Sequence, residues 1–167
     1  MAQPRFQWIL FDWGGTLMLE DGPEDVPMGL WPEVRAIPEA RETLADLSSR
    51  FRLAIATNAT VSGRAMIELA LARVSMLQFI SEIFCFMEIG QRKESAQFWN
   101  MVISTLRASP RDLAMVGDSL EPDVIAPRRV GVFSVWFNQD NRQLIDPQGL
   151  PTIHRLRDLV PLLTSEV

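Results

Sequence analysis

Short apolar runs alternate with segments of helical spacing along almost the whole chain. The run at residues 8–11 has no charged side chain, which predicts a strand buried on both faces, as found inside parallel sheets. Further strands are predicted at residues 53–56, 83–86, 112–116 and 132–137, with a brief edge strand at residues 153–154. Helices are predicted at residues 38–50, 61–73, 94–107, 121–129 and 156–163. This order predicts an α/β fold, a three-layer sandwich with a parallel Rossmann-like sheet and right-handed crossovers.

Two prolines and one glycine indicate how the predicted helices begin, bend and end. Pro38 suits the first turn of the helix at residues 38–50, where a missing N–H costs nothing. Pro127 lies inside the helix at residues 121–129 and should bend or shorten it, because proline cannot donate the helical hydrogen bond. Gly131 is then a favourable stop.

The charge balance argues against nucleic acid as a partner. The chain has 16 Lys and Arg against 21 Asp and Glu, a formal charge of -5, and its basic residues form no stripe. No apolar run reaches the roughly 18 residues of a membrane span, so no membrane association is expected. The single cysteine, Cys85, is expected to be a packed thiol. With no signal peptide after Met1, the expected location is the cytoplasm.

Reactive side chains follow the predicted strands, at the point where each strand ends. These residues are Asp12 after the first strand, Thr57 and Asn58 after the second, Lys93 in the loop after the third, and Asp118 with Asp123 after the fourth. In parallel sheets, ligands bind beyond the carboxyl ends of the strands, where the strand order reverses. We therefore expect these side chains to meet at one site.

This set of residue types predicts a magnesium and phosphate site. Carboxylates brought together repel one another unless a cation lies among them, and oxygen ligands suit Mg²⁺ rather than zinc. Gly14 and Gly15 let the backbone approach a ligand, and Thr16 offers a hydroxyl or backbone N–H to an anion. Lys93 adds a donor for phosphoryl oxygens. A structural reading, with Asp118 as a helix cap and Lys93 as a surface charge, explains each residue but not their shared position.

With these motifs the sequence resembles the haloacid dehalogenase superfamily of aspartate-nucleophile hydrolases. The first family motif, Asp-x-Asp-x-Thr, falls on residues 12–16, and the second, a Ser or Thr after a strand, falls on Thr57. The third motif, a lysine before a helix, matches Lys93. The fourth, Gly-Asp with a later Asp, matches residues 117–123. The likeness spans residues 6–137, and we expect a single core domain over residues 1–167.

The resemblance implies a role for each matched residue. Asp12 would become an aspartyl-phosphate, and Lys93 would neutralise Asp12 and the phosphoryl oxygens, so these two form the predicted catalytic pair. The implied Mg²⁺ ligands are Asp12, the Gly14 carbonyl and Asp118, with Asp123 bound through water or lying behind them. The predicted substrate-binding set is Gly15, Thr16, Thr57, Asn58 and Lys93.

Gly14 is the one departure from the family pattern. Phosphatases of this family carry an aspartate there, which protonates the leaving group, and such help is typically worth about 10² to 10⁴ in rate. Three explanations remain open: a good leaving group, binding with little turnover, or a carboxylate supplied by the following loop. The loop candidates are Glu20, Asp21, Glu24 and Asp25.

Two functions are therefore predicted. The first is a Mg²⁺-dependent, phosphatase-like hydrolase, and the second is a weakened relative that binds a phospho-ligand or protein partner. Neither residues 18–36 nor residues 59–79 leave room for a cap domain. The site should thus accept a phosphorylated small molecule or a macromolecular substrate, unless a homo-oligomer partner covers it.

Overall fold

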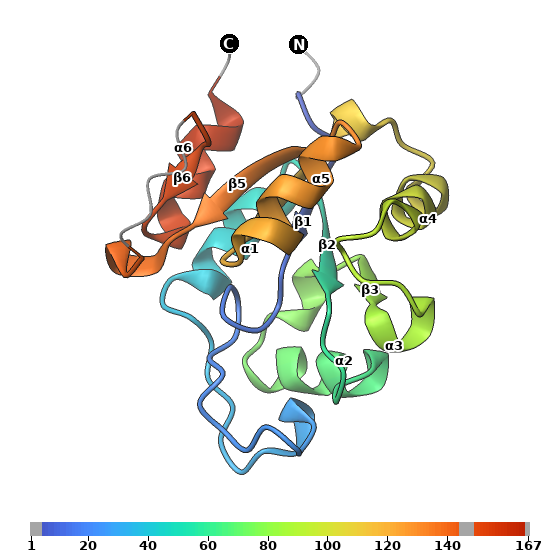
Figure 1. The fold of residues 1–167 in the computed structure, drawn as a ribbon. Helices are drawn as coiled ribbons and strands as arrows, with labels where there is room; N and C mark the ends of the chain where they lie inside the picture. Colours follow the sequence, from blue (N-terminus) through green and yellow to red (C-terminus); the bar gives the residue numbers. More distant parts are fainter. Residues whose placement is uncertain (1–4, 144–148, 166–167) are drawn as a thin grey trace.

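The structure, a computed structural model, describes residues 5–143 and 149–165. In these ranges six strands form one sheet with the order β3-β2-β1-β4-β5-β6, and all neighbouring strands are parallel (Figure 1). The strands are β1 (Trp8–Phe11), β2 (Arg52–Thr57), β3 (Glu82–Cys85), β4 (Leu113–Gly117), β5 (Phe133–Phe137) and β6 (Thr152–Ile153). The α-helices are α1 (Ala40–Ser48), α2 (Arg64–Arg73), α3 (Phe86–Ile89), α4 (Ala96–Leu106), α5 (Ala126–Arg129) and α6 (Leu159–Thr164).

Two apolar cores cover the two faces of the sheet, and β1 contributes to both. Ile9 and Phe11 belong to the core that includes buried residues of α1, α2 and α6. Trp8 and Leu10 belong to the other core, together with the buried face of α4. All four residues of β1 are buried because successive side chains of a strand point to opposite faces. The predicted three-layer α/β architecture is thereby confirmed.

The strand order reverses at β1. Because β1 pairs with both β2 and β4, Phe11 lies between Ile55 and Val116 in register. The residues that follow β1 and β4 therefore leave the sheet side by side. This is the position at which parallel α/β sheets bind ligands.

Three helices differ from the predictions in their boundaries or helix type. Helix α1 begins at Ala40 rather than Pro38, because Glu39 adopts a left-handed conformation with φ of 68°. The predicted helix at residues 121–129 is a π-helix over Leu120–Ile125 followed by α5. Pro127 lacks the N–H that a continuous α-helix would need. In the C-terminal region, the helix predicted at residues 156–163 starts as a 3₁₀ turn, Leu156–Asp158, before α6.

Two further differences concern segments predicted as strand or loop. Phe86 was predicted as the last residue of a strand, but it begins α3, within the segment otherwise predicted as a loop. Residues 138–151, for which neither strand nor helix is predicted, contain a short 3₁₀ turn, Gln139–Asn141, and residues 144–148 lie outside the described part of the chain. Among the described residues, no helix is long and apolar enough to cross a bilayer.

The segment between β1 and α1 lies beside α2, beyond the ends of the strands (Figure 1, blue). It contains a 3₁₀ turn, Met28–Leu30, and is otherwise loop. The Arg73 guanidinium of α2 donates hydrogen bonds to the Gly29 and Trp31 carbonyls at 3.0 and 2.6 Å. The Ser62 hydroxyl accepts one from the Met28 N–H at 3.1 Å. These bonds fix the segment as a wall next to the carboxyl ends of the strands.

Candidate active site

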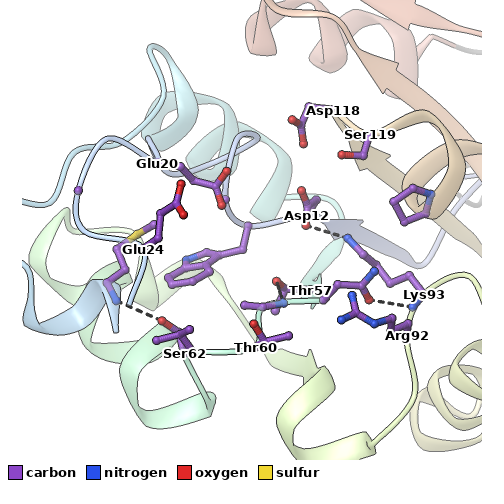
Figure 2. A pocket seen from close by; sticks show the side chains of 18 of the residues that line it. Asp12, Glu20, Glu24, Thr57, Thr60, Ser62, Arg92, Lys93, Asp118 and Ser119 are labelled. Atoms are coloured by element: carbon purple, nitrogen blue, oxygen red, sulfur yellow. Dashed lines mark hydrogen bonds and ion pairs between the residues drawn. The ribbon is translucent and has the colours of Figure 1, made fainter. Parts of the chain in front are cut away.

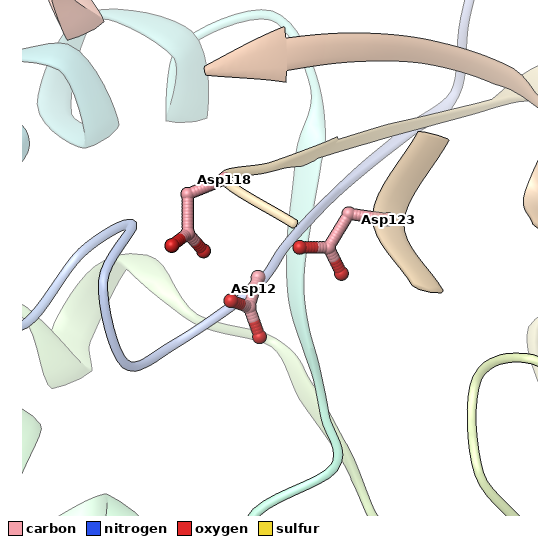
Figure 3. Close-up of side chains that lie close together, drawn as sticks. All are labelled: Asp12, Asp118 and Asp123. Atoms are coloured by element: carbon pink, nitrogen blue, oxygen red, sulfur yellow. The ribbon is translucent and has the colours of Figure 1, made fainter. Parts of the chain in front are cut away.

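Three aspartates meet at the strand-order reversal (Figure 3). Asp12 directly follows β1, Asp118 directly follows β4, and Asp123 lies in the π-helical turn. One carboxylate oxygen from each aspartate lies within 4.8 Å of the others. The structure therefore brings together the carboxylates that the sequence places at the ends of different strands.

Lys93 lies among these carboxylates. Its Nζ is 2.8 Å from Asp12 Oδ1 and 2.6 Å from Asp123 Oδ1, and its side chain is 3% exposed. Burial by itself would lower the pKa of Lys93, but the charges and hydrogen bonds of the two aspartates outweigh burial and hold that pKa above its ordinary value. Lys93 is thus a fixed positive charge at any physiological pH.

The backbone of Lys93 is held from two sides. The Asn58 Oδ1 accepts a hydrogen bond from the Lys93 N–H at 2.8 Å, and the Trp99 indole N–H donates to the Lys93 carbonyl at 2.7 Å. The Asn58 Nδ2 also donates to Glu94 at 2.9 Å. Asn58, directly after β2, and Trp99 of α4 therefore fix the backbone from which the ammonium extends before any ligand arrives, and such preorganisation favours strong electrostatic stabilisation.

Two glycines allow the carboxylates to approach the backbone closely. Gly15 has a φ of 78°, and a Cβ there would lie 2.6 Å from Asp118 Oδ2. A Cβ at Gly117 would lie 2.2 Å from Asp123 Oδ2. Neither distance is compatible with a side chain, so both positions need glycine for the cluster to form.

The hydrogen bonds of the cluster leave two carboxylates available to a cation. Both oxygens of Asp123 are engaged, one by Lys93 and the other by the Ser119 N–H at 3.0 Å. Asp118 Oδ1 accepts from the Thr16 hydroxyl at 3.1 Å. The same hydroxyl lies 3.4 Å from Asp12 Oδ2, so one O–H is shared between the two carboxylates, and Asp118 Oδ2 accepts no hydrogen bond from the described residues. Asp12 and Asp118 therefore suit direct contact with a metal, and Asp123 suits a supporting place.

The electrostatics of the cluster also fit a divalent cation. Burial and the negative charge of Asp12 raise the pKa of Asp118 and of Asp123 to about 7 each, partly opposed by hydrogen bonds from Thr16 to Asp118 and from Lys93 to Asp123. One ammonium does not balance three carboxylates. An oxygen-only set of this kind is the chemistry that Mg²⁺ favours.

The cluster opens into a pocket of about 580 Å³ (Figure 2). Its lining is mainly polar and comes from the ends of β1, β2 and β4, from the loop before α4 and from the segment after β1. The lining residues include Asp12, Trp13, Gly14, Glu20, Glu24, Trp31, Thr57, Asn58, Ser62, Arg92, Lys93, Asp118 and Ser119. The Thr57 hydroxyl accepts a hydrogen bond from the Ala59 N–H at 3.1 Å, which orients it at the pocket wall.

The predicted substrate-binding residues fall into two groups. Thr57, Asn58 and Lys93 line the pocket. Gly15 and Thr16 are not part of its described lining. The Gly15 N–H donates to the Met18 carbonyl at 2.8 Å, and the Thr16 hydroxyl also accepts from the Asp118 N–H at 3.2 Å. The geometry therefore gives Gly15 and Thr16 the task of shaping the carboxylate cluster.

The four loop carboxylates considered as replacements for the missing acid have different surroundings in the structure. Asp21 is paired with Arg35, and the described pocket lining includes Glu20 and Glu24 but neither Asp21 nor Asp25. A Cβ added at Gly14 would lie 2.0 Å from Glu20 Oε1. Shielding from water raises the pKa of Glu20, and the charges of Asp12 and Glu24 raise it further, against Lys93.

Sequence reasoning missed several pocket residues. Trp13 and Arg92 lie directly beside Asp12 and Lys93 in the chain, so adjacency to a predicted site residue could have identified them. Ser119 follows Asp118 in the same way, whereas Ser62 carries no such pattern and reaches the pocket only through the way its loop folds. The Trp13 indole N–H is buried and has no hydrogen-bond partner among the described residues, so it is a donor without an acceptor at the pocket wall.

Known proteins are similar to this chain over ranges that include part of the candidate site. Residues 29–131 match the family of haloacid dehalogenase-like hydrolases, a range that includes Lys93 and Asp118 and begins after Asp12. A phosphoserine phosphatase of Thermus thermophilus is 30% identical over 132 residues, which are 77% of this chain and 50% of that protein. The chain spans about half the length of the curated relatives it matches.

Solved structures share the fold over nearly the whole chain. An uncharacterised protein of Listeria monocytogenes serotype 4b has a TM-score of 0.81 at 21% identity, covering 95% of this chain and 97% of that one. The HAD-hydrolase YfnB of Bacillus subtilis, solved bound to magnesium, has a TM-score of 0.80 at 16% identity, covering 96% of this chain and 100% of that one. By its sequence match and its fold, this chain belongs to the haloacid dehalogenase-like hydrolases.

Proposed function

We propose that this chain is a Mg²⁺-dependent phosphoric-ester hydrolase that acts through an aspartyl-phosphate on Asp12. The observation that carries the proposal is the position of Asp12, which lines the pocket, is paired with Lys93 at 2.8 Å and lies beside the carboxylate of Asp118. The phosphoserine phosphatase relative and the family match support hydrolysis of this kind.

The carboxylates of Asp12 and Asp118 would hold Mg²⁺, and Asp123 would act through a bound water. The Gly14 carbonyl stays a predicted ligand from the family resemblance. When bound, the ion neutralises negative charge on the phosphoryl group and lowers the barrier to attack by an anion.

The residues of the chain then divide the remaining work. Asp12 attacks phosphorus, the bond from phosphorus to the leaving oxygen breaks, and water later hydrolyses the aspartyl-phosphate. Lys93 pairs with Asp12 and offers charge to the phosphoryl oxygens, while Thr57 and the Asn58 N–H orient those oxygens. The proposed substrate is a phosphorylated small molecule, and the exposed outer residues of the pocket, among them Glu24 and Arg92, also leave access for a phosphate carried by a macromolecule.

Gly14 supports a second candidate, a binding protein with little turnover. Without an acid at this position, an ester with a poor leaving group would be cleaved slowly. In that case the pocket would retain a phospho-ligand, and Asp12 would contribute to affinity rather than to reaction.

The first experiment compares the chain with its Asp12→Asn variant on acetyl phosphate and p-nitrophenyl phosphate, with Mg²⁺. We expect the variant to be slower by about 10⁴-fold or more, because the nucleophile is lost. Acid-quenched protein should carry one phosphoryl group, released by hydroxylamine and missing from the variant. Asp25→Asn, an exposed carboxylate outside the described lining, is the matched control. Equal rates for the chain and Asp12→Asn, with phosphate binding retained, would favour the second candidate.

A further inference from the structure

We propose that Glu20 replaces the missing general acid at position 14 and protonates the leaving group. The inference rests on the proposed function, and it assigns a catalytic role to a residue outside the family motifs. Glu20 lies eight residues after Asp12, in the segment that forms the pocket wall. The glutamate would deliver from the loop what the family pattern delivers from the residue two places after the nucleophile.

The space next to Gly14 carries the argument. A Cβ built there would lie 2.0 Å from Glu20 Oε1 and 2.6 Å from Glu20 Cδ, so the glutamate carboxyl fills the volume that a side chain at residue 14 would enter. Gly14 does not have a positive φ, so its backbone would accept an aspartate. Glycine at this position is therefore explained by what occupies the space and not by the conformation of the turn.

The carboxyl is also directed at the site. Figure 2 shows Glu20 across the pocket from Asp12, with its carboxylate on the side that faces the aspartate. Both residues line the same 580 Å³ pocket. A phosphate held between Lys93 and Thr57 would present its leaving oxygen to the side away from Asp12, because attack and departure occur in line.

The other candidates fit less well. Asp21 pairs with Arg35, and Asp25 is exposed and outside the described lining. Glu24 lines the pocket, but the three heavy atoms nearest to a residue-14 Cβ all belong to Glu20. Of these candidates, Glu20 is the one shown both to line the pocket and to fill the space beside Gly14.

The reaction balances with this assignment. As the bond from Asp12 to phosphorus forms and the bond from phosphorus to the leaving oxygen breaks, protonated Glu20 gives its proton to that oxygen and an alcohol leaves. The resulting Glu20 carboxylate takes a proton from the attacking water. The hydroxide joins phosphorus, the bond to Asp12 breaks, and phosphate, Asp12 and protonated Glu20 are regenerated.

The test varies the leaving group and moves the carboxylate. Rates are measured for p-nitrophenyl, phenyl and benzyl phosphate, in order of increasing need for a proton. Glu20→Gln should lower kcat/KM by about 10²- to 10⁴-fold for benzyl phosphate and by less than about tenfold for p-nitrophenyl phosphate. Gly14→Asp combined with Glu20→Ala should recover most of the benzyl phosphate rate lost in Glu20→Ala. Asp25→Asn is the control on the same loop, and circular dichroism checks folding.

Each outcome decides between the two proposals. Equal loss on all three esters in Glu20→Gln, or no recovery in the double variant, overturns the role of Glu20 while Asp12-dependent turnover of p-nitrophenyl phosphate still supports the proposed function. A leaving-group-dependent loss that follows Glu24→Gln instead also overturns it. If the unchanged chain hydrolyses every ester no faster than Asp12→Asn does, the proposed function is wrong, and the role of Glu20 as general acid is wrong with it.

Discussion

The two sides of the pocket are built in opposite ways. On the sheet side, Lys93 and Asp123 are almost fully buried, and direct pairs hold Lys93 in position, at 2.6 Å from Asp123 and 2.8 Å from Asp12. On the loop side, Glu20 and Glu24 are exposed and belong to a segment held mainly by hydrogen bonds to α2. Charges that act on the phosphoryl group are rigid, whereas the groups that meet the rest of a substrate stand on a loop.

This difference has a physical basis. A buried charge needs fixed partners, because its removal from water costs several kcal/mol of free energy, roughly, whereas an exposed charge stays hydrated. The exposed carboxylates need none, so the loop can vary without unfolding the domain. The chemistry shared by a family is thus expected at the strand ends, and the identity of the acid can move to the loop.

Removing the buried cation should give the largest effect. We expect Lys93→Met to cost about 3–5 kcal/mol in the free energy of unfolding at pH 8 with EDTA, because Asp12 and Asp123 lose their partner. The loss should shrink at low pH, where the carboxylates take up protons. Urea denaturation measures it, with the exposed neighbour Arg92→Met as the control.

A double variant separates charge from packing in that result. Lys93→Met combined with Asp123→Asn removes one charge of each sign and should recover a large part of the lost stability. A cost below about 1 kcal/mol for Lys93→Met would mean that the buried ion pairs stabilise the protein no more than exposed ion pairs do. The proposed contrast between the two sides of the pocket would then be wrong.

Two glycines test the same contrast with one methyl group each. Gly117→Ala places a Cβ 2.2 Å from Asp123 Oδ2, a carboxylate that Lys93 and Ser119 hold in place, so we expect a cost of about 1–3 kcal/mol. Gly14→Ala creates a similar overlap with Glu20, but that exposed side chain can rotate away. Its cost should stay below about 0.5 kcal/mol. Equal costs, measured by urea denaturation, would contradict a rigid sheet side and a yielding loop side.

The sheet side was also the part that the sequence could predict. The buried run at residues 8–11 and the carboxylates after the strands follow from local pattern, and the parallel topology alone brings Asp12 next to Asp118. The loop side was not predictable in this way. Four carboxylates follow Gly14 within eleven residues, and only the folded path of the loop selects Glu20 among them. The π-helical turn that carries Asp123 was missed for a related reason, because proline signals a break without saying which helix replaces it.

Competition between protons and Mg²⁺ should also distinguish the sheet side of the pocket from the loop side. We expect it to give the smallest effect of these tests. The pKa of Asp118 and of Asp123 is raised from 3.8 to about 7, so between these values the metal-free folded protein holds more protons than the unfolded chain. Their contribution to stability is therefore present at low pH and is lost as pH rises through about 7. Bound Mg²⁺ must displace the same protons. Its apparent affinity should then rise by about tenfold per pH unit for each displaced proton and level off above pH 7.

The measurement is the rise in Tm on adding Mg²⁺ at several pH values between about 5 and 8. We expect the rise to grow with pH in the unchanged chain and in Glu20→Gln, and to be nearly abolished in Asp118→Asn. A Mg²⁺ effect that is flat with pH would mean that the carboxylates between β1 and β4 hold no protons for the ion to displace. A slope that disappears in Glu20→Gln instead would place the titrating group on the loop. Only a slope that depends on Asp118 and survives the loss of Glu20 assigns metal binding to the sheet side and leaves proton transfer to the loop.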